Sequence, residues 1–145
     1  MATAPAAAKL TPAAEAWRLM FELFVTRKPH FAVLAAEFDL SPSQAHALAL
    51  IEPDTPRSMH ELAVLLSCHP SNVTGIVDGL EARNLIERRP ATHDRRLKLL
   101  ALTDEGAAVR GRALARVFEP PPQLAALPAA DQRALRDILT RAFRR

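Results

Sequence analysis

The 145-residue sequence is poor in the residue types that build covalent and catalytic sites. Its one cysteine, Cys68, cannot form an internal disulfide, which fits a reducing cytoplasm. The four glycines form no Gly-rich phosphate loop, and neither a nucleophile elbow nor a pair of acid–base carboxylates can be identified. The five histidines are scattered, with no two at i, i+4. The sequence therefore predicts no enzyme, no cofactor and no metal site.

Long hydrophobic runs are also missing. No segment approaches the roughly 20 apolar residues that a membrane span requires, and residues 1–9 lack the basic segment and apolar block of a secretory signal. We therefore expect a cytoplasmic protein with no membrane partner. The hydrophobic fraction of 49% and charged fraction of 24% are ordinary for one globular domain. Residues 1–10, rich in alanine, are expected to form a disordered tail.

Positive charge is unevenly distributed, although the net charge is only +3. Residues 83–98 contain six basic and two acidic residues, a surplus of four. Such a concentration is typical of a surface that contacts nucleic-acid phosphates. A solvated, charged hairpin is the alternative reading of the same run.

Apolar spacing and helix-start signals predict mainly helices. Trp17, Phe21 and Phe24 share one helical face, which predicts a helix over 12–27 that Pro29 interrupts before a second short stripe over 31–38. Serine caps predict helices beginning near 41 and at 58, the latter with Leu62, Ala63, Leu65 and Leu66 directed inward. Pro70 begins another helix after a three-residue turn, and this pair is a helix-turn-helix pattern.

The spacing of apolar residues changes after Asn84. Asn84 itself suits the left-handed conformation at the end of the preceding helix. Residues 85–89 and 96–102 are strand-length segments around a polar, basic connection, which predicts a two-stranded wing. Thr103 caps a helix that ends near 118, and a last helix covers about 129–143. The expected fold is mainly α with a small β-wing (α+β). The apolar stripes of the terminal helices lack cover within the domain, which favours a second copy of the chain as partner.

Two blocks of sequence resemble one family. Residues 68–86 look like a recognition helix and its exit, and Asp94-Arg95-Arg96 with the 102–106 segment Leu-Thr-Asp-Glu-Gly looks like a wing signature. The order of elements from about Ala14 onward is similar to the MarR, or multiple antibiotic resistance regulator, family. The resemblance implies a homodimeric, ligand-responsive repressor on a pseudo-palindromic operator in double-stranded DNA. It implies dimerisation helices at 11–40 and 119–145, a winged helix-turn-helix at 41–103 and a linking helix at 104–118.

The resemblance also implies site residues. Ser71, Asn72, Thr74 and Gly75 would address the major groove, Gly75 standing where many relatives carry long, often basic side chains. Arg96 would enter the minor groove, oriented by an ion pair with Asp94. The other wing arginines would contact phosphates; these are Arg88, Arg89 and Arg95. The alternatives are helix capping for the first group and weak surface ion pairs for the second.

The aromatic residues suggest an effector site. Trp17, Phe21, Phe24 and Phe31 would line a pocket for a small aromatic or phenolic effector, and core packing explains them equally well. Two other functions stay open. Cys68 could make the protein a redox-responsive regulator, and the basic patch could belong to a non-specific architectural DNA-binding protein.

Overall fold

The computed structural model describes residues 10–92, 94 and 96–144. It confirms a mainly helical fold with a small sheet. The elements are α1 (Pro12–Glu37), α2 (Pro42–Leu50), β1 (Arg57–Ser58), α3 (Met59–Leu65), α4 (Pro70–Ala82), β2 (Ile86–Pro90), β3 (Lys98–Leu102), α5 (Asp104–Val117), α6 (Pro122–Ala125) and α7 (Ala129–Phe143). The predicted tail lies outside the described residues except for Leu10, which is exposed.

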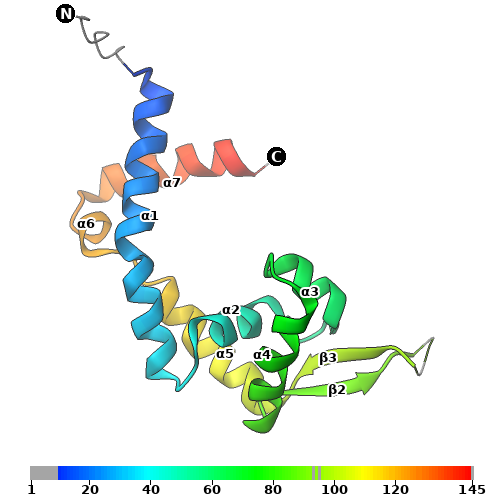
Figure 1. Ribbon diagram of the computed structural model, residues 1–145. Helices are drawn as coiled ribbons and strands as arrows, with labels where there is room; N and C mark the ends of the chain where they lie inside the picture. Colours follow the sequence, from blue (N-terminus) through cyan, green and yellow to red (C-terminus); the bar gives the residue numbers. More distant parts are fainter. Residues whose placement is uncertain (1–9, 93, 95, 145) are drawn as a thin grey trace, which may run out of the picture.

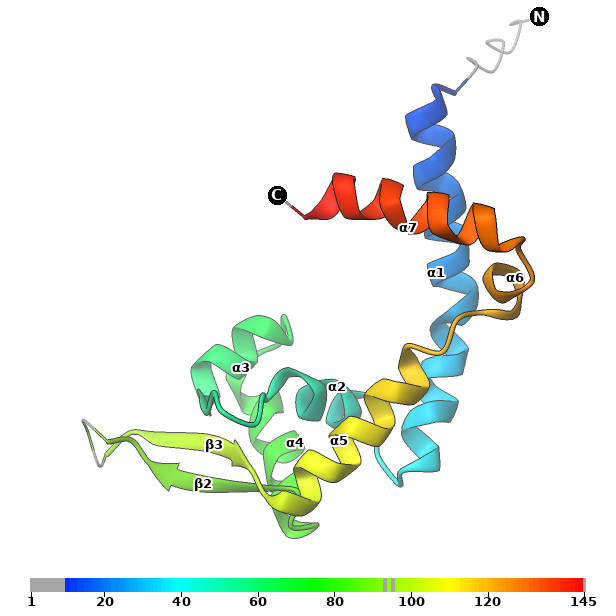
Figure 2. The ribbon, with the colours of Figure 1, turned by 180° about the vertical axis from the view of Figure 1, so that it is seen from behind.

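The molecule divides into a lobe, residues 34–117, and an arm, residues 10–33 and 118–144. Figures 1 and 2 show α2, α3, α4 and the sheet gathered in the lobe, while most of α1, with α6 and α7, extends away from it. Among the residues whose side chains the structure describes, every buried one belongs to the lobe and none belongs to the arm. None of the described helices is long and apolar enough to cross a bilayer.

Helix α1 is longer than the sequence predicted, because it continues through Pro29 to Glu37. The predicted interruption is therefore wrong. A proline inside a helix deprives the carbonyl four residues earlier, that of Val25, of its donor. Helix-forming residues flank Pro29, and the end of α1 is fixed in the lobe by the buried Leu34 and Ala35. This tertiary burial outweighs the local cost of the proline.

The predicted wing is confirmed, with one strand added. The antiparallel sheet has the order β1-β3-β2, and Arg57 of β1 pairs with Leu100. The strands predicted at 85–89 and 96–102 are observed at 86–90 and 98–102. Strand β1 is only two residues long, too short to produce an alternating pattern in the sequence.

Local sequence features account for the helix ends and the close contacts of the lobe. Ser41 and Ser58 both form capping boxes, with Gln44 and Glu61 respectively. Asn84 has φ 56°, as its place after α4 predicts. A Cβ at Gly106 would overlap the carbonyl of Leu85, so this glycine permits the close approach of α5 to the residue that directly precedes β2.

The core lies where α2, α3, α4 and the sheet meet. Its largest fully buried side chains are Leu48, Ile51, Leu62, Val73, Val77, Leu80, Leu85, Ile86 and Leu100. The inward direction predicted for Leu65 is wrong, because that side chain is 42% exposed. Helix α3 has only seven residues, and its two buried positions, Leu62 and Ala63, already face the core.

Candidate nucleic-acid interface

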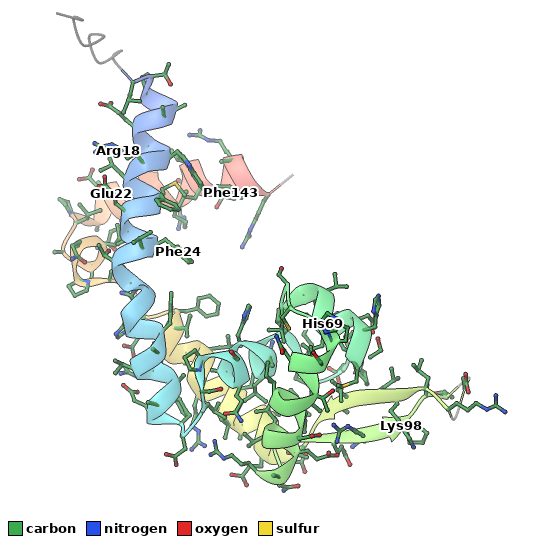
Figure 3. The ribbon with its side chains drawn as sticks, viewed as in Figure 1. Arg18, Glu22, Phe24, His69, Lys98 and Phe143 are labelled. Atoms are coloured by element: carbon green, nitrogen blue, oxygen red, sulfur yellow. The ribbon has the colours of Figure 1, made fainter. Side chains whose placement is uncertain are left out.

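Helix α4 presents a polar face at its beginning. His69 caps it: its Nδ1 accepts the N–H of Ser71 at 3.3 Å and lies 2.8 Å from the Ser71 hydroxyl (Figure 3). Ser71, Asn72 and Thr74 are exposed, while Val73 on the opposite side is fully buried. The first turns of α4 therefore offer hydroxyl, amide and backbone N–H groups to a ligand outside the lobe.

The two glycines of α4 differ in their surroundings. A Cβ at Gly79 would overlap the side chain of Gln44, so Gly79 is needed for the packing of α4 on α2. Apart from the backbone of α4 itself, no atom of the described residues lies within 4 Å of a Cβ placed at Gly75. Gly75 therefore leaves a free space on the exposed face, beside Thr74.

The wing carries its exposed charges near the tip. Arg96 and Lys98 are exposed, the latter at the beginning of β3 (Figure 3). The predicted ion pair between Asp94 and Arg96 is wrong: Asp94 Oδ1 accepts the backbone N–H of Arg96 at 2.9 Å, which shapes the turn and leaves the guanidinium unconstrained by Asp94. Arg95 lies outside the described residues.

Arg88 and Arg89 point to different partners. Arg88 donates to Asp78 Oδ1 at 2.6 Å and to Glu81, both on α4. These bonds, chiefly the one to Asp78, raise the pKa of Arg88. Arg89 pairs with Glu87 on its own strand. The sequence reasoning missed Asp78 and Glu81, although their i, i+3 spacing on α4 places them on one face.

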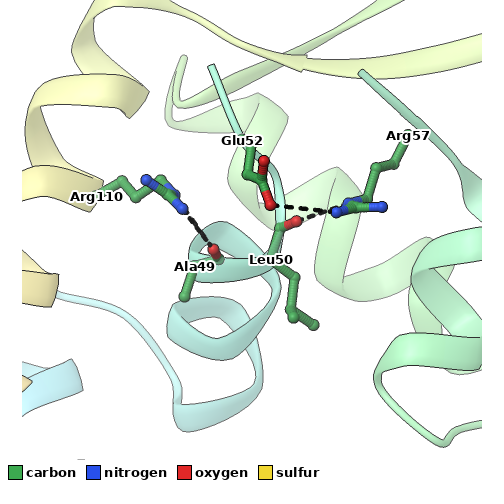
Figure 4. Close-up of polar contacts among 5 residues, drawn as sticks. All are labelled: Ala49, Leu50, Glu52, Arg57 and Arg110. Carbon is green, nitrogen blue, oxygen red and sulfur yellow. Dashed lines mark hydrogen bonds and ion pairs between the residues drawn. The ribbon is translucent and has the colours of Figure 1, made fainter. Parts of the chain in front are cut away.

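Two arginines join the end of α2 to neighbouring elements (Figure 4). Arg110 of α5 donates to the carbonyl of Ala49 through Nε at 3.2 Å and Nη2 at 3.0 Å. Arg57 donates from Nε to the carbonyl of Leu50 at 2.8 Å and lies 3.5 Å from Glu52. The last carbonyls of a helix lack internal donors and attract cations, so these contacts fix α5 and the sheet to α2.

A further arginine fixes the end of α1. Arg83, which follows α4, donates to the carbonyls of Phe38, at 3.1 Å, and of Asp39, at 2.5 Å. Arg116 of α5 bonds Glu37 at 3.2 Å and Glu119, and these carboxylates raise its pKa. The end of α1 is thus joined to both α4 and α5.

An apolar pocket of about 910 Å³ lies between α1, α2 and α5. Phe24, Phe31 and Phe38 line it, and His46 and Arg110 are the charged or titratable residues of its wall. Of the four predicted effector residues, the structure brings Phe24 and Phe31 together here, with ring centroids 6.4 Å apart. Trp17 and Phe21 lie farther along α1 on the arm, outside the lining of this pocket.

Cys68 is half-buried and packs against the core of the lobe. This position gives it a packing role. Within residues 10–92, 94 and 96–144, no group of three or more His, Cys, Asp or Glu side chains is arranged to hold a metal ion.

A helix-turn-helix followed by a β-hairpin, with a polar face on the second helix, defines a winged helix-turn-helix. Comparison with known proteins agrees with this class: residues 40–98 match the family model described as MarR family. The winged helix-turn-helix of this chain is therefore similar to that of the MarR family, as the sequence resemblance indicated.

Individual proteins and solved structures are also similar to this chain. The transcriptional repressor MdtR of Bacillus subtilis is 36% identical over 84 residues, which are 58% of this chain and 54% of MdtR. The chain thus spans about half the length of this curated relative. A crystal structure of a MarR mutant from E. coli has a TM-score of 0.75 at 23% identity, over 93% of this chain and 98% of that one. A MepR mutant of S. aureus bound to an oligodeoxyribonucleotide has a TM-score of 0.63 at 20% identity, over 87% and 94%.

Proposed function

We propose that the protein is a transcription repressor that binds double-stranded DNA sequence-specifically as a homodimer in the cytoplasm, and that it is not an enzyme. The observation that carries this is the exposed polar beginning of α4 beside a basic wing on the same lobe. Two relatives support it by what their names say: MdtR is a repressor, and the MepR mutant is bound to an oligodeoxyribonucleotide.

In this proposal α4 enters the major groove, where every base pair presents a distinct pattern. Ser71, Asn72 and Thr74 meet base edges or phosphates, and the absent side chain of Gly75 lets the helix approach closely. The wing tip, with Arg96 and the turn shaped by Asp94, reaches the adjacent minor groove. Arg89 and Arg95 meet phosphates, which position the protein without reading sequence.

The arm supports the dimer. It exposes large apolar side chains that a soluble chain normally covers: Trp17 is 64% exposed, Phe118 77% and Phe143 70%. Helix α7 has no buried residue, although Leu135 and Leu139 share one of its faces. A second copy would cover these faces by twofold symmetry and would place two α4 helices about one DNA turn apart, roughly 34 Å.

The apolar pocket favours a ligand response. It is enclosed by the end of α1, by α2 and by α5, the elements that join arm and lobe. A small aromatic or phenolic effector would pack on Phe24 and Phe31, with His46 or Arg110 available to a polar group. An effector that binds better to a DNA-incompetent arrangement lowers operator affinity by that difference alone.

Fluorescence anisotropy with the intergenic DNA beside the gene tests the proposal. We expect tight binding to one duplex containing an inverted repeat and much weaker binding to its scrambled version. Asn72→Ala should weaken operator binding by about 1–3 kcal/mol, whereas Gln123→Ala, in α6, should not. Phenolic compounds added to the preformed complex should release the DNA. Equal affinity for all duplexes with a steep salt slope would instead indicate the architectural alternative.

A further inference from the structure

Arg88 connects two elements that the proposed function requires to act together. It lies in the middle of β2, opposite Leu100 of β3. Its Nη2 donates to Asp78 Oδ1 at 2.6 Å and its Nη1 to Glu81, so one planar guanidinium spans two carboxylates on α4. Such a forked contact fixes orientation as well as distance.

The position of this contact along the wing is significant. Burial falls along β2 from the fully buried Ile86, through the half-buried Glu87 and Arg88, to the exposed Arg89 and Pro90. Arg88 is therefore the last residue of β2 with a bond to α4 before the strand extends into solvent. A small rotation at this point would move the wing tip, several residues farther on, by a larger distance.

The neighbouring cations lack this arrangement. The side chain of Arg88 is 29% exposed and that of Arg89 60%. Among the described residues, Arg89 pairs with Glu87 of its own strand alone, and Arg96 and Lys98 form no ion pair. Arg88 also neutralises Asp78, a carboxylate that is 59% exposed on the recognition helix.

We propose that Arg88 is a positioning residue, held by Asp78 and Glu81, that sets the angle between the wing and α4. This rests on the proposed function and replaces the expected phosphate contact of Arg88. The arginine keeps the wing where both elements reach neighbouring grooves of one duplex, and it removes a negative charge that would repel the phosphates.

The salt dependence of operator binding distinguishes the two roles. Loss of one phosphate contact lowers the slope of log K against log salt by about 0.9. We expect Arg88→Gln to weaken operator binding about tenfold, as for coupled groups in one ion network, with the slope nearly unchanged. Arg89→Gln is the matched control and should lower the slope instead.

A charge swap supplies a rescue. Arg88→Glu alone should weaken binding more than Arg88→Gln, because three carboxylates then meet. Adding Glu81→Arg restores an ion pair between the same elements with the wild-type net charge, and should recover most of the lost affinity. A phosphate contact would not be recovered, because the carboxylate at position 88 would still repel DNA. A lowered slope for Arg88→Gln together with failed rescue would overturn the inference and leave the proposed function intact.

Amide hydrogen exchange of the free protein tests the inference even if no operator DNA is known. Arg88→Gln should accelerate exchange of the amides of residues 87–89, 91 and 97–99, and leave those of residues 73–80 in α4 protected. Unchanged exchange in the hairpin would overturn the inference. Absence of any sequence-specific binding by the wild-type protein would overturn the proposed function alone.

Discussion

About half of the residues are apolar in both the lobe and the arm, but the two regions differ in what covers these side chains. In the lobe, α2, α3, α4 and the sheet enclose nine large side chains that are less than 2% exposed. None of the arm side chains that the structure describes is buried, and α6 and α7 begin at prolines without a side-chain cap. The lobe therefore contains the contacts that stabilise it, whereas the arm is complete only with the proposed second copy.

The largest effect should come from the close approach inside the lobe. Gly106→Ala forces a methyl group against the carbonyl of Leu85, and overpacking of this kind costs about 1–3 kcal/mol. Gly111→Ala in the same helix is the control. Outside the backbone of α5, no described atom lies within 4 Å of its new methyl, so Gly111→Ala should stabilise the protein by about 0.5–1 kcal/mol. Urea unfolding measures both; equal effects would contradict this view of the lobe.

A smaller effect should appear in the arm and depend on concentration. Trp17→Ala removes an exposed aromatic from the proposed dimer face and should weaken dimerisation about tenfold, or roughly 1.4 kcal/mol. Val64→Ala is matched, because Val64 is also 64% exposed but lies on the lobe, and it should leave the dimer unchanged. Sedimentation equilibrium decides between them. If the wild-type protein is monomeric at micromolar concentration, the arm is not covered by a second copy, and the proposed difference between arm and lobe is wrong.

The smallest effect concerns a helix cap of the lobe. Ser58→Ala should cost about 1 kcal/mol, because Ser58 caps α3. The pKa of Glu61 is lowered from 4.5, first by the backbone N–H of Ser58 and then by its hydroxyl. Because the pKa of Glu61 is lower in the folded protein, the stabilisation by its ionised carboxylate is fully present above pH 4.5. It is lost as the pH falls through the pKa of the folded state. Denaturant unfolding between pH 7 and 3 should show a flatter decline for Glu61→Gln than for wild type.

Much of the lobe could be predicted because its signals are local. Ser41 with Gln44, and Ser58 with Glu61, each form a capping box that marks the start of a helix within four residues. Asn84 marks the end of a helix in the same local way. The polar beginning of α4 follows from the same reading. These features depend on neighbours in sequence, which periodicity and capping rules describe directly.

The remaining features depend on partners distant in sequence. Pro29 lies inside α1 because residues beyond it are buried in the lobe, and β1 exists because β3 pairs with it. Arg83 bonds carbonyls 44 and 45 residues earlier, and Arg110 bonds one 61 residues earlier. The role of Arg88 is similar: a charge run indicates where cations gather, and only the fold shows which carboxylate each one meets.

Gly75 has a consequence for how such a protein diverges. Position 75 faces outward from α4, and none of the residues that the structure describes comes within 4 Å of a Cβ there outside the helix backbone, so a larger side chain can be accepted without rearranging the core. Under the proposed function, the same position lies against the bases. Changes in operator preference can therefore accumulate at this site by single substitutions, and descendants of one ancestral repressor can acquire separate sets of target genes without loss of folding stability.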